Sequence, residues 1–373
     1  MWPSQQAASE PDLSAMLSLT AWDVKYTAAV ARRASRNKPL SPLRPKPADM
    51  SPLQRTLQDG PQAPLECFTD SLGLNIIVYS WPATHTPKAV ILLCHGLDCF
   101  AESDLAKRPG LVNDEGYRGS WFEVLNDAGY LIYSFDYQGM GYSESVIDGL
   151  RSMCFDYDDY VDEAVQLQSL LKERHPALPM VVMGGSMGGA VALLTAERTP
   201  QSFAAAVVWC PAVGRFERLK AKPENAVVLP LLGCLSASMP QLPIAAKHIN
   251  PESMATAEEF VIGLPRYNQP SKMRARYASE GLRVGEAAID NASRLTMPLW
   301  IAHAPDDEFT DYDGSVALMA AATSTDDKVL IDDLAGADHN VVEADTLKHG
   351  LKYAEQVVAW LDARVAGGGV KLW

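Results

Sequence analysis

A serine flanked by pairs of glycines lies in the middle of the chain. The run Gly184–Gly189, GGSMGG, follows the apolar stretch Met180–Met183 and precedes a helical pattern that begins at Ala190. A serine at a sharp turn from a strand into a helix takes a strained backbone conformation, and the glycines leave room for the neighbouring strand and helix. The hydroxyl then lies at the positive end of the helix dipole, which stabilises a developing negative charge. The motif therefore predicts that Ser186 is a nucleophile rather than part of an ordinary structural turn.

A nucleophilic serine needs a base, and histidine is the usual choice. The chain has seven histidines, namely His85, His95, His175, His248, His303, His339 and His349. After a strand–serine–helix turn of this kind, the acid and then the histidine follow in chain order, which removes the first three. The surroundings of His248 favour a surface residue of the cap, and those of His349 favour a cation at a helix end. His339, in a polar loop after the last predicted strand, is the predicted base.

The orienting acid is expected in the loop after the predicted strand 298–303. Four acidic residues occur there, namely Asp306, Asp307, Glu308 and Asp311. A buried carboxylate in this loop would hold the tautomer of the histidine and stabilise the imidazolium that forms as the serine attacks. Asp307 is the predicted acid, with Asp306 as its main alternative, whereas Asp311 better suits the N-cap of the next helix.

Two backbone N–H groups are expected to form an oxyanion hole. One follows the nucleophile and belongs to Met187. The other comes from the loop after the first parallel strand, Ala89–Cys94, where Gly96 permits a tight turn and Leu97 supplies the donor. We expect His95 to brace this loop and not to act as the base.

Short runs rich in Val, Ile and Leu alternate with helical patterns along the chain, which is typical of a parallel sheet covered on both faces. Eight strands are predicted, at 65–71, 74–81, 89–95, 130–136, 180–184, 205–210, 298–303 and 328–332, of which the first two are an antiparallel pair. Helices are predicted at 120–128, 156–175, 187–198, 314–322 and 345–363. The chain between Cys210 and Pro298 is far longer than one crossover needs, so it predicts an inserted cap, or lid, at about 212–294.

The first 64 residues have a different character. Apolar residues recur at near-helical spacing over 10–36, and a proline-rich stretch, 37–64, predicts an extended linker. The N-terminus has neither the basic region nor the apolar region of a secretory signal, and its acidic residues argue against a transit peptide. We predict an N-terminal helix and linker over 1–64, a catalytic domain over 65–363 and a tail over 364–373.

Composition and charge argue against several classes of protein. A net charge of −14 repels phosphate backbones, so nucleic-acid binding is not expected. The chain has no apolar run long enough to span a bilayer. Six cysteines without CxxC spacing predict neither a zinc site nor a disulfide framework. We expect a cytoplasmic protein that needs no metal and no organic cofactor.

Six pieces of the chain, in order, resemble the monoacylglycerol lipase and lysophospholipase branch of the α/β-hydrolases, in the serine aminopeptidase-like hydrolase family. They are His95-Gly96, Ser120-Trp121-Phe122, Asp136–Ser143, Gly184–Gly189, Asp307 and His339. The resemblance covers 65–363 and implies the α/β-hydrolase fold. It also implies a cap with an apolar helix that makes transient contact with membrane surfaces, for which the uncharged run Ala226–Leu235 is the match; the alternative for this run is a cap helix that packs on the core. The chain departs from the pattern in a long insertion, Asp98–Gly119.

These features predict a serine hydrolase that cleaves the carboxylic ester of a monoacylglycerol or a lysophospholipid through Ser186, His339 and Asp307, by way of an acyl-enzyme. One alternative of the same fold is an esterase for small soluble esters. Another is an aminopeptidase-like amidase, which would need a cap glutamate to hold the free α-amino group of its substrate. A non-catalytic binding protein is the third alternative.

Overall fold

The computed structural model describes most of the predicted catalytic domain. The described residues are 41–46, 59–61, 63–102, 105, 116–147, 150–223, 225–246, 272–334, 339, 341–344 and 351–365. The helix predicted within 10–36 lies outside them, as do residues 247–271 of the predicted cap and residues 366–373 of the predicted tail.

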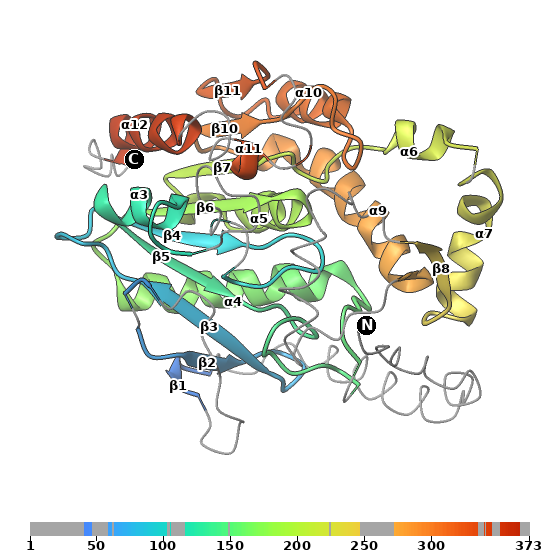
Figure 1. Cartoon of the computed structure of the whole chain (residues 1–373), viewed down its shortest axis with the longest axis horizontal. Coiled ribbons are helices and arrows are strands. Elements are labelled where there is room, and N and C mark those ends of the chain that lie inside the picture. Colours follow the sequence, from blue (N-terminus) through green and yellow to red (C-terminus); the bar gives the residue numbers. More distant parts are fainter. Residues whose placement is uncertain are drawn as a thin grey trace, which may run out of the picture.

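A nine-stranded sheet forms the centre of the molecule (Figure 1). Its strands, in spatial order, are β1 (Arg44–Pro45), β2 (Glu66–Thr69), β3 (Asn75–Trp81), β5 (Tyr130–Phe135), β4 (Ala89–Cys94), β6 (Met180–Gly185), β7 (Ala205–Trp209), β10 (Leu299–Ala302) and β11 (Lys328–Ile331). The first three strands are antiparallel to their neighbours, and the other six are parallel. The α/β-hydrolase architecture expected from the sequence is therefore present, with the carboxyl ends of the parallel strands at one edge.

The main sheet has nine strands among the described residues, one more than the eight predicted, and a separate pair of strands between β7 and β10 was not predicted. The additional strand, β1, lies in the stretch predicted to be an extended linker and pairs with β2 at the edge of the sheet. Pro45 is tolerated there because an edge strand does not need every backbone N–H. The guanidinium of Arg44 also donates hydrogen bonds to the side chains of Thr69 and Asn75, which fixes the strand against the sheet.

Helices cover both faces of the sheet, as expected (Figure 1). On one face lie α4 (Tyr157–Arg174), α5 (Ser186–Arg198) and α10 (Tyr312–Ala321), and on the other lie α3 (Trp121–Asp127) and α12 (Lys352–Val365). Alternate residues of β4 belong to the two cores, since Val90 and Leu92 pack on the first face and Ile91 and Leu93 on the second. A short helix, α11 (Val341–Ala344), lies between β11 and α12.

The elements between β7 and β10 extend to one side of the sheet (Figure 1). They are α6 (Glu217–Ala221), α7 (Asn225–Ser238), the antiparallel pair β8 (Pro243–Ala246) and β9 (Lys272–Arg274), and α9 (Ala275–Asp290). The helix α9 packs against α5 and α4 and also against α7, so it joins this segment to the main sheet. No helix among the described residues has both the length and the apolar character needed to cross a membrane.

Candidate active site

Ser186 occupies the turn between β6 and α5. The strand ends at Gly185, the helix begins at Ser186, and the backbone of the serine has φ of 54°, in the left-handed region. A side chain in that region is strained, which is typical of residues held for function. A Cβ on Gly188 would lie 2.1 Å from the carbonyl oxygen of Cys94, so glycine is required for helix α5 to approach β4 this closely. The sequence predicted this strained strand-to-helix turn.

Asp307 and His339 form a hydrogen-bonded pair at the ends of β10 and β11. Oδ2 of Asp307 lies 2.7 Å from Nδ1 of His339. The carboxylate is fully buried, whereas the imidazole side chain is 16% exposed. Asp306, the alternative acid, is exposed. Of the two adjacent aspartates, the structure thus brings Asp307 to the histidine.

The carboxylate of Asp307 is surrounded by donors. Oδ1 accepts the backbone N–H groups of Phe309 and Thr310, at 2.7 and 3.0 Å, and Oδ2 accepts the hydroxyl of Thr310 at 2.8 Å. Burial alone would raise the pKa of Asp307, but hydrogen bonds from His303 and His339 more than offset it and hold the pKa well below its usual range. Asp307 is therefore a carboxylate that accepts hydrogen bonds and donates none.

This assigns the tautomer of the neutral His339 ring. Because Nδ1 faces a carboxylate that can only accept, Nδ1 carries the hydrogen. Nε2 is then left with its lone pair, which is the form in which an imidazole takes a proton from a hydroxyl. The pair has the chemistry of an oriented general base.

Asp311 lies at the N-cap position of α10, as predicted, but its side chain makes no capping hydrogen bond. Its carboxylate instead accepts the backbone N–H of Arg218, in α6, at 3.2 Å. This contact joins the loop of Asp307 to the segment between β7 and β10.

The two predicted oxyanion donors follow adjacent strands. Strand β4 pairs with β6 so that Cys94 is opposite Gly184, and Leu97 and Met187 each follow these partners by three residues. Met187 lies in the first turn of α5, where backbone N–H groups have no partner within the helix. The register thus brings the two residues to the same edge of the sheet.

His95 braces the loop that contains Leu97. The ring is fully buried, Nδ1 donates to the carbonyl of Gly96 at 2.9 Å, and Nε2 accepts the backbone N–H of Tyr137 at 3.3 Å. Burial lowers the pKa of His95 to about 4, so the ring is neutral at physiological pH. His95 is therefore a structural histidine, as the sequence predicted.

Asp136 and Ser143 fix the loop that follows β5 by hydrogen bonds to other parts of the chain. The buried carboxylate of Asp136 accepts the hydroxyl of Tyr79 and the backbone N–H groups of Ala101 and Tyr142, at 2.7 to 2.9 Å. The hydroxyl of Ser143 accepts the backbone N–H of Ile77 at 2.8 Å. The N–H of Ala101 links this loop to the segment after Leu97.

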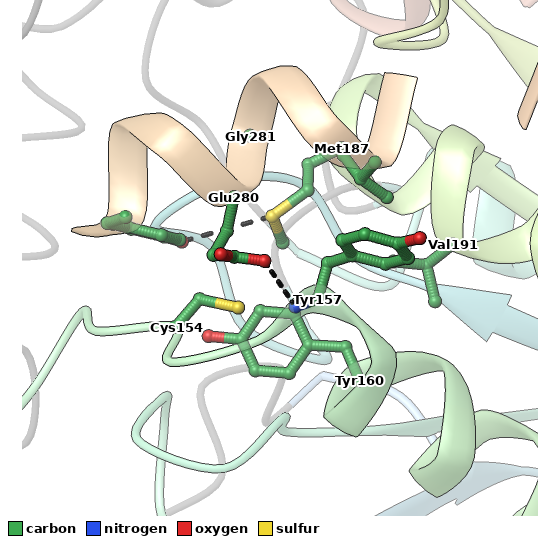
Figure 2. A pocket seen from close by; sticks show the side chains of 9 residues that line it. Cys154, Tyr157, Tyr160, Met187, Val191, Glu280 and Gly281 are labelled. Atoms are coloured by element: carbon green, nitrogen blue, oxygen red, sulfur yellow. Dashed lines mark hydrogen bonds between the residues drawn. The ribbon is translucent and has the colours of Figure 1, made fainter. Parts of the chain in front are cut away.

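A small cavity lies behind Met187, under α9 (Figure 2). Its lining residues are Cys154, Tyr157, Tyr160, Met187, Val191, Tyr277, Glu280, Gly281 and Val284. The hydroxyl of Tyr277 contacts Sδ of Met187 at 3.9 Å, and Glu280 accepts the backbone N–H of Tyr157 at 3.2 Å. The side chain of Met187 therefore packs against α9.

The glutamates described between β7 and β10 are paired with cations of this chain. Glu280 is buried and contacts Arg283 at 2.6 Å and Arg276 at 3.3 Å. Glu217 and Glu286 both face Lys220, at 4.0 and 3.4 Å. The other cap glutamates, Glu224, Glu252, Glu258 and Glu259, lie outside the described residues. Glu280, the buried glutamate of this segment, is thus neutralised by two arginines, whereas Glu217 and Glu286 are exposed and share one lysine.

The family model described as serine aminopeptidase, S33, matches residues 109–343 of the chain. The human monoglyceride lipase is 27% identical over 333 residues, which cover 87% of this chain and 98% of that protein. A monoacylglycerol lipase of Mycolicibacterium smegmatis is 27% identical over 258 residues, which cover 68% and 82%.

Solved structures share the fold. A soluble variant of monoglyceride lipase from Saccharomyces cerevisiae, in complex with a substrate analog, superposes with a TM-score of 0.62 at 19% identity and covers 84% of this chain and 99% of that chain. The monoacylglycerol lipase of Paleococcus ferrophilus superposes with a TM-score of 0.57 at 21% identity and covers 78% and 99%.

Proposed function

This chain belongs to the serine aminopeptidase (S33) family of hydrolases, and we propose that it hydrolyses the carboxylic ester of a monoacyl lipid, either a monoacylglycerol or a lysophospholipid. The observation that carries the proposal is the hydrogen bond between the buried Asp307 and the partly exposed His339, which follow β10 and β11 at the same end of the sheet at which Ser186 begins α5. The names of the relatives support an ester of a single acyl chain as the substrate class.

In the proposed mechanism, Nε2 of His339 takes the hydroxyl proton of Ser186 as the oxygen attacks the ester carbonyl. The developing oxyanion accepts hydrogen bonds from the N–H groups of Leu97 and Met187, and Asp307 stabilises the imidazolium. His339 then gives its proton to the leaving oxygen of glycerol or of the lysophospholipid headgroup, which leaves the acyl group on Ser186. Water, deprotonated by the same histidine, attacks the acyl-enzyme and releases the fatty acid.

Helix α7 supports a substrate that is held in a lipid surface. It carries no charged residue from Asn225 to Ser238, and it exposes Val227 (72%) and Leu231 (52%). These two residues are four apart and therefore share one face of the helix. An exposed apolar face of this kind is typical of surfaces that bind membranes or partners. We propose that α7 makes transient contact with lipid surfaces and delivers the acyl chain to the site.

The amidase alternative has less support. An aminopeptidase needs a carboxylate for the free α-amino group of its substrate, and each glutamate in the described part of the segment between β7 and β10 already contacts a cation, Glu280 most closely. Hydrolysis of a monoacyl lipid ester needs no such carboxylate, because this substrate offers only an acyl chain and a polar headgroup.

A matched substrate panel tests the proposal. Fatty-acid release is measured from a long-chain monoacylglycerol, lysophosphatidylcholine, a triacylglycerol and a short p-nitrophenyl ester, and amine release from an aminoacyl amide, with Ser186→Ala as the blank. Preferential turnover of the monoacyl lipids, absent in the variant, is the expected result. Turnover of the short ester or the amide alone would reject the lipid assignment and keep the hydrolase.

A further inference from the structure

Asp307 faces two histidines. Its Oδ2 lies 2.7 Å from Nδ1 of His339 and 3.3 Å from Nε2 of His303. His303 is the first residue after β10, and its side chain is fully buried. The acid is thus in contact with one histidine from its own loop and one from the loop after the neighbouring strand.

The hydrogen-bond partners of His303 determine which ring nitrogen carries a hydrogen. Nε2 lies 3.3 Å from Oδ2 of Asp307 and 3.3 Å from the carbonyl oxygen of Thr310, and both oxygens can only accept. Nε2 must therefore carry the hydrogen and donate it. On the other side of the ring, Nδ1 lies 2.7 Å from the hydroxyl of Ser315, in α10, which is also fully buried and can act as donor. The ring is held from both sides in one orientation.

The contact with His303 affects Oδ2 of Asp307, which is the oxygen that orients His339. Oδ2 accepts hydrogen bonds from Nδ1 of His339 and from the hydroxyl of Thr310. The Nε2–H of His303 is shared between the carbonyl oxygen of Thr310 and Oδ2, each 3.3 Å away, so three polar hydrogens face the negative charge of this one oxygen. In a site this buried, each such interaction is stronger than it would be in water. Removing one donor leaves more of the charge for the remaining histidine.

We propose that His303 is a positioning residue for the base: through its Nε2–H it fixes the carboxylate of Asp307 and limits how strongly that carboxylate holds the proton of His339. The proposal rests on the proposed roles of Ser186, Asp307 and His339. The alternative is a purely structural role, in which His303 only fastens α10 to β10 through Ser315 and does not affect the rate.

Two substitutions at the same position separate these roles. His303→Asn keeps a polar atom near the position of Nδ1, facing Ser315, and loses the N–H toward Asp307. His303→Gln places an amide N–H near the position of Nε2 and loses the contact with Ser315. A positioning role makes the asparagine variant the worse enzyme, whereas a fastening role makes the glutamine variant the less stable protein.

The readouts are kcat, KM, the pH profile of kcat/KM on a soluble p-nitrophenyl ester, and the thermal midpoint. For His303→Asn we expect a loss of roughly tenfold, as from one hydrogen bond to a charged group, expressed in kcat with KM nearly unchanged. The acid limb of the profile moves to higher pH, because a less divided charge on Oδ2 retains the imidazolium proton more strongly. His303→Gln recovers much of the rate and the original acid limb.

A distant histidine provides the control. His175 lies at the end of α4, where its Nε2 contacts the hydroxyl of Tyr133 at 3.1 Å. In His175→Asn we expect the acid limb of the kcat/KM profile to stay in place. Equal losses in His303→Asn and His303→Gln with an unmoved acid limb, or full activity of His303→Asn, would overturn the proposal. Turnover by Ser186→Ala would instead reject the proposed function, so the two failures are distinguishable.

Discussion

Oδ2 of Asp307 accepts a 2.7 Å hydrogen bond from Nδ1 of His339, a residue 32 positions further along the chain. The two residues meet because they follow β10 and β11, which are neighbouring parallel strands in register from Leu299 to Ala302. The pairing of these two strands therefore brings Asp307 and His339 together. The contribution of their hydrogen bond to the rate can be tested without changing Ser186.

Replacing Asp307 by Asn is expected to lower kcat by about 10⁴-fold, the size of effect seen when the orienting acid of a serine hydrolase becomes an amide. The amide can present an N–H to Nδ1 and so favours the wrong tautomer of His339. Steady-state kinetics on a soluble ester measure the loss. Asp306→Asn is the matched control, because that neighbouring aspartate is exposed, and it should retain nearly full activity. Equal losses in the two variants would contradict the assignment of the acid.

Gly188 and Gly281 differ in whether the structure leaves room for an alanine side chain. A Cβ on Gly188 would meet the carbonyl oxygen of Cys94 at 2.1 Å, so Gly188→Ala is expected to lower stability and activity together. Gly281, in α9, has nothing within 4 Å of such a Cβ, and Gly281→Ala is expected to add about 0.5–1 kcal/mol to the free energy of unfolding. Urea unfolding of both variants provides the comparison. A stable, active Gly188→Ala would show that α5 does not approach β4 so closely.

Glu197, near the end of α5, gives the protein a pH-dependent stability. Desolvation by burial raises the pKa of this carboxyl from its usual 4.5 to about 9, although Arg294 and Arg198 lower it in part. The folded state thus keeps the proton to higher pH than the unfolded state, so stability is fully present below about 4.5 and is lost as the pH rises toward 9.

Glu197→Gln removes the titration and leaves the shape nearly unchanged. The variant is expected to be more stable than the wild type at pH 8, by roughly 1–3 kcal/mol, and to differ little at pH 5. Thermal unfolding at the two pH values measures this. The same difference at both pH values would mean that the effect comes from packing and that the carboxyl is not protonated in the folded state.

The exposed face of α7 should matter only for substrate held in a lipid surface. Val227→Glu is expected to reduce fatty-acid release from vesicle-borne monoacylglycerol by roughly tenfold, because an apolar side chain of this size contributes about 1.5 kcal/mol on burial. Turnover of a short soluble ester stays the same. Val316→Glu, an exposed valine in α10, is the control and should affect neither reaction. Equal effects of the two variants on vesicles would remove α7 from the proposed lipid contact.

Most of the fold could be predicted because its signals are long and repeated. The apolar runs that became β4 and β6 are buried on both faces, and such strands are hard to mistake in a chain that alternates them with helical patterns. Strand β1 could not be predicted in the same way, since two residues that include a proline carry no pattern. Helix α7 contains Pro230, and only the family resemblance implied an apolar helix over Ala226–Leu235, which the structure confirms.

The residues of the candidate site also differ in how far the sequence could predict them. Ser186 stands in a motif whose spacing has a physical cause, and the loop after β10 was identified by its position in the chain. The choice between Asp306 and Asp307 depends on which carboxylate turns inward, and only the burial of Asp307 beside His339 distinguishes them. His303 carried one signal, its place four residues before the acid, but that spacing does not say whether the ring faces the carboxylate.

Ser186 is the proposed nucleophile, and mass spectrometry of the protein after reaction with a phosphonylating agent identifies the residue that attacks. The protein is treated with a long-chain fluorophosphonate, an analogue of a monoacyl ester, and digested, and the modified residue is identified. We expect one phosphonyl adduct on Ser186 of the wild type and none in Ser186→Ala, with adduct formation strongly slowed in Asp307→Asn. An adduct on another residue, or undiminished fatty-acid release by Ser186→Ala, would contradict this proposal.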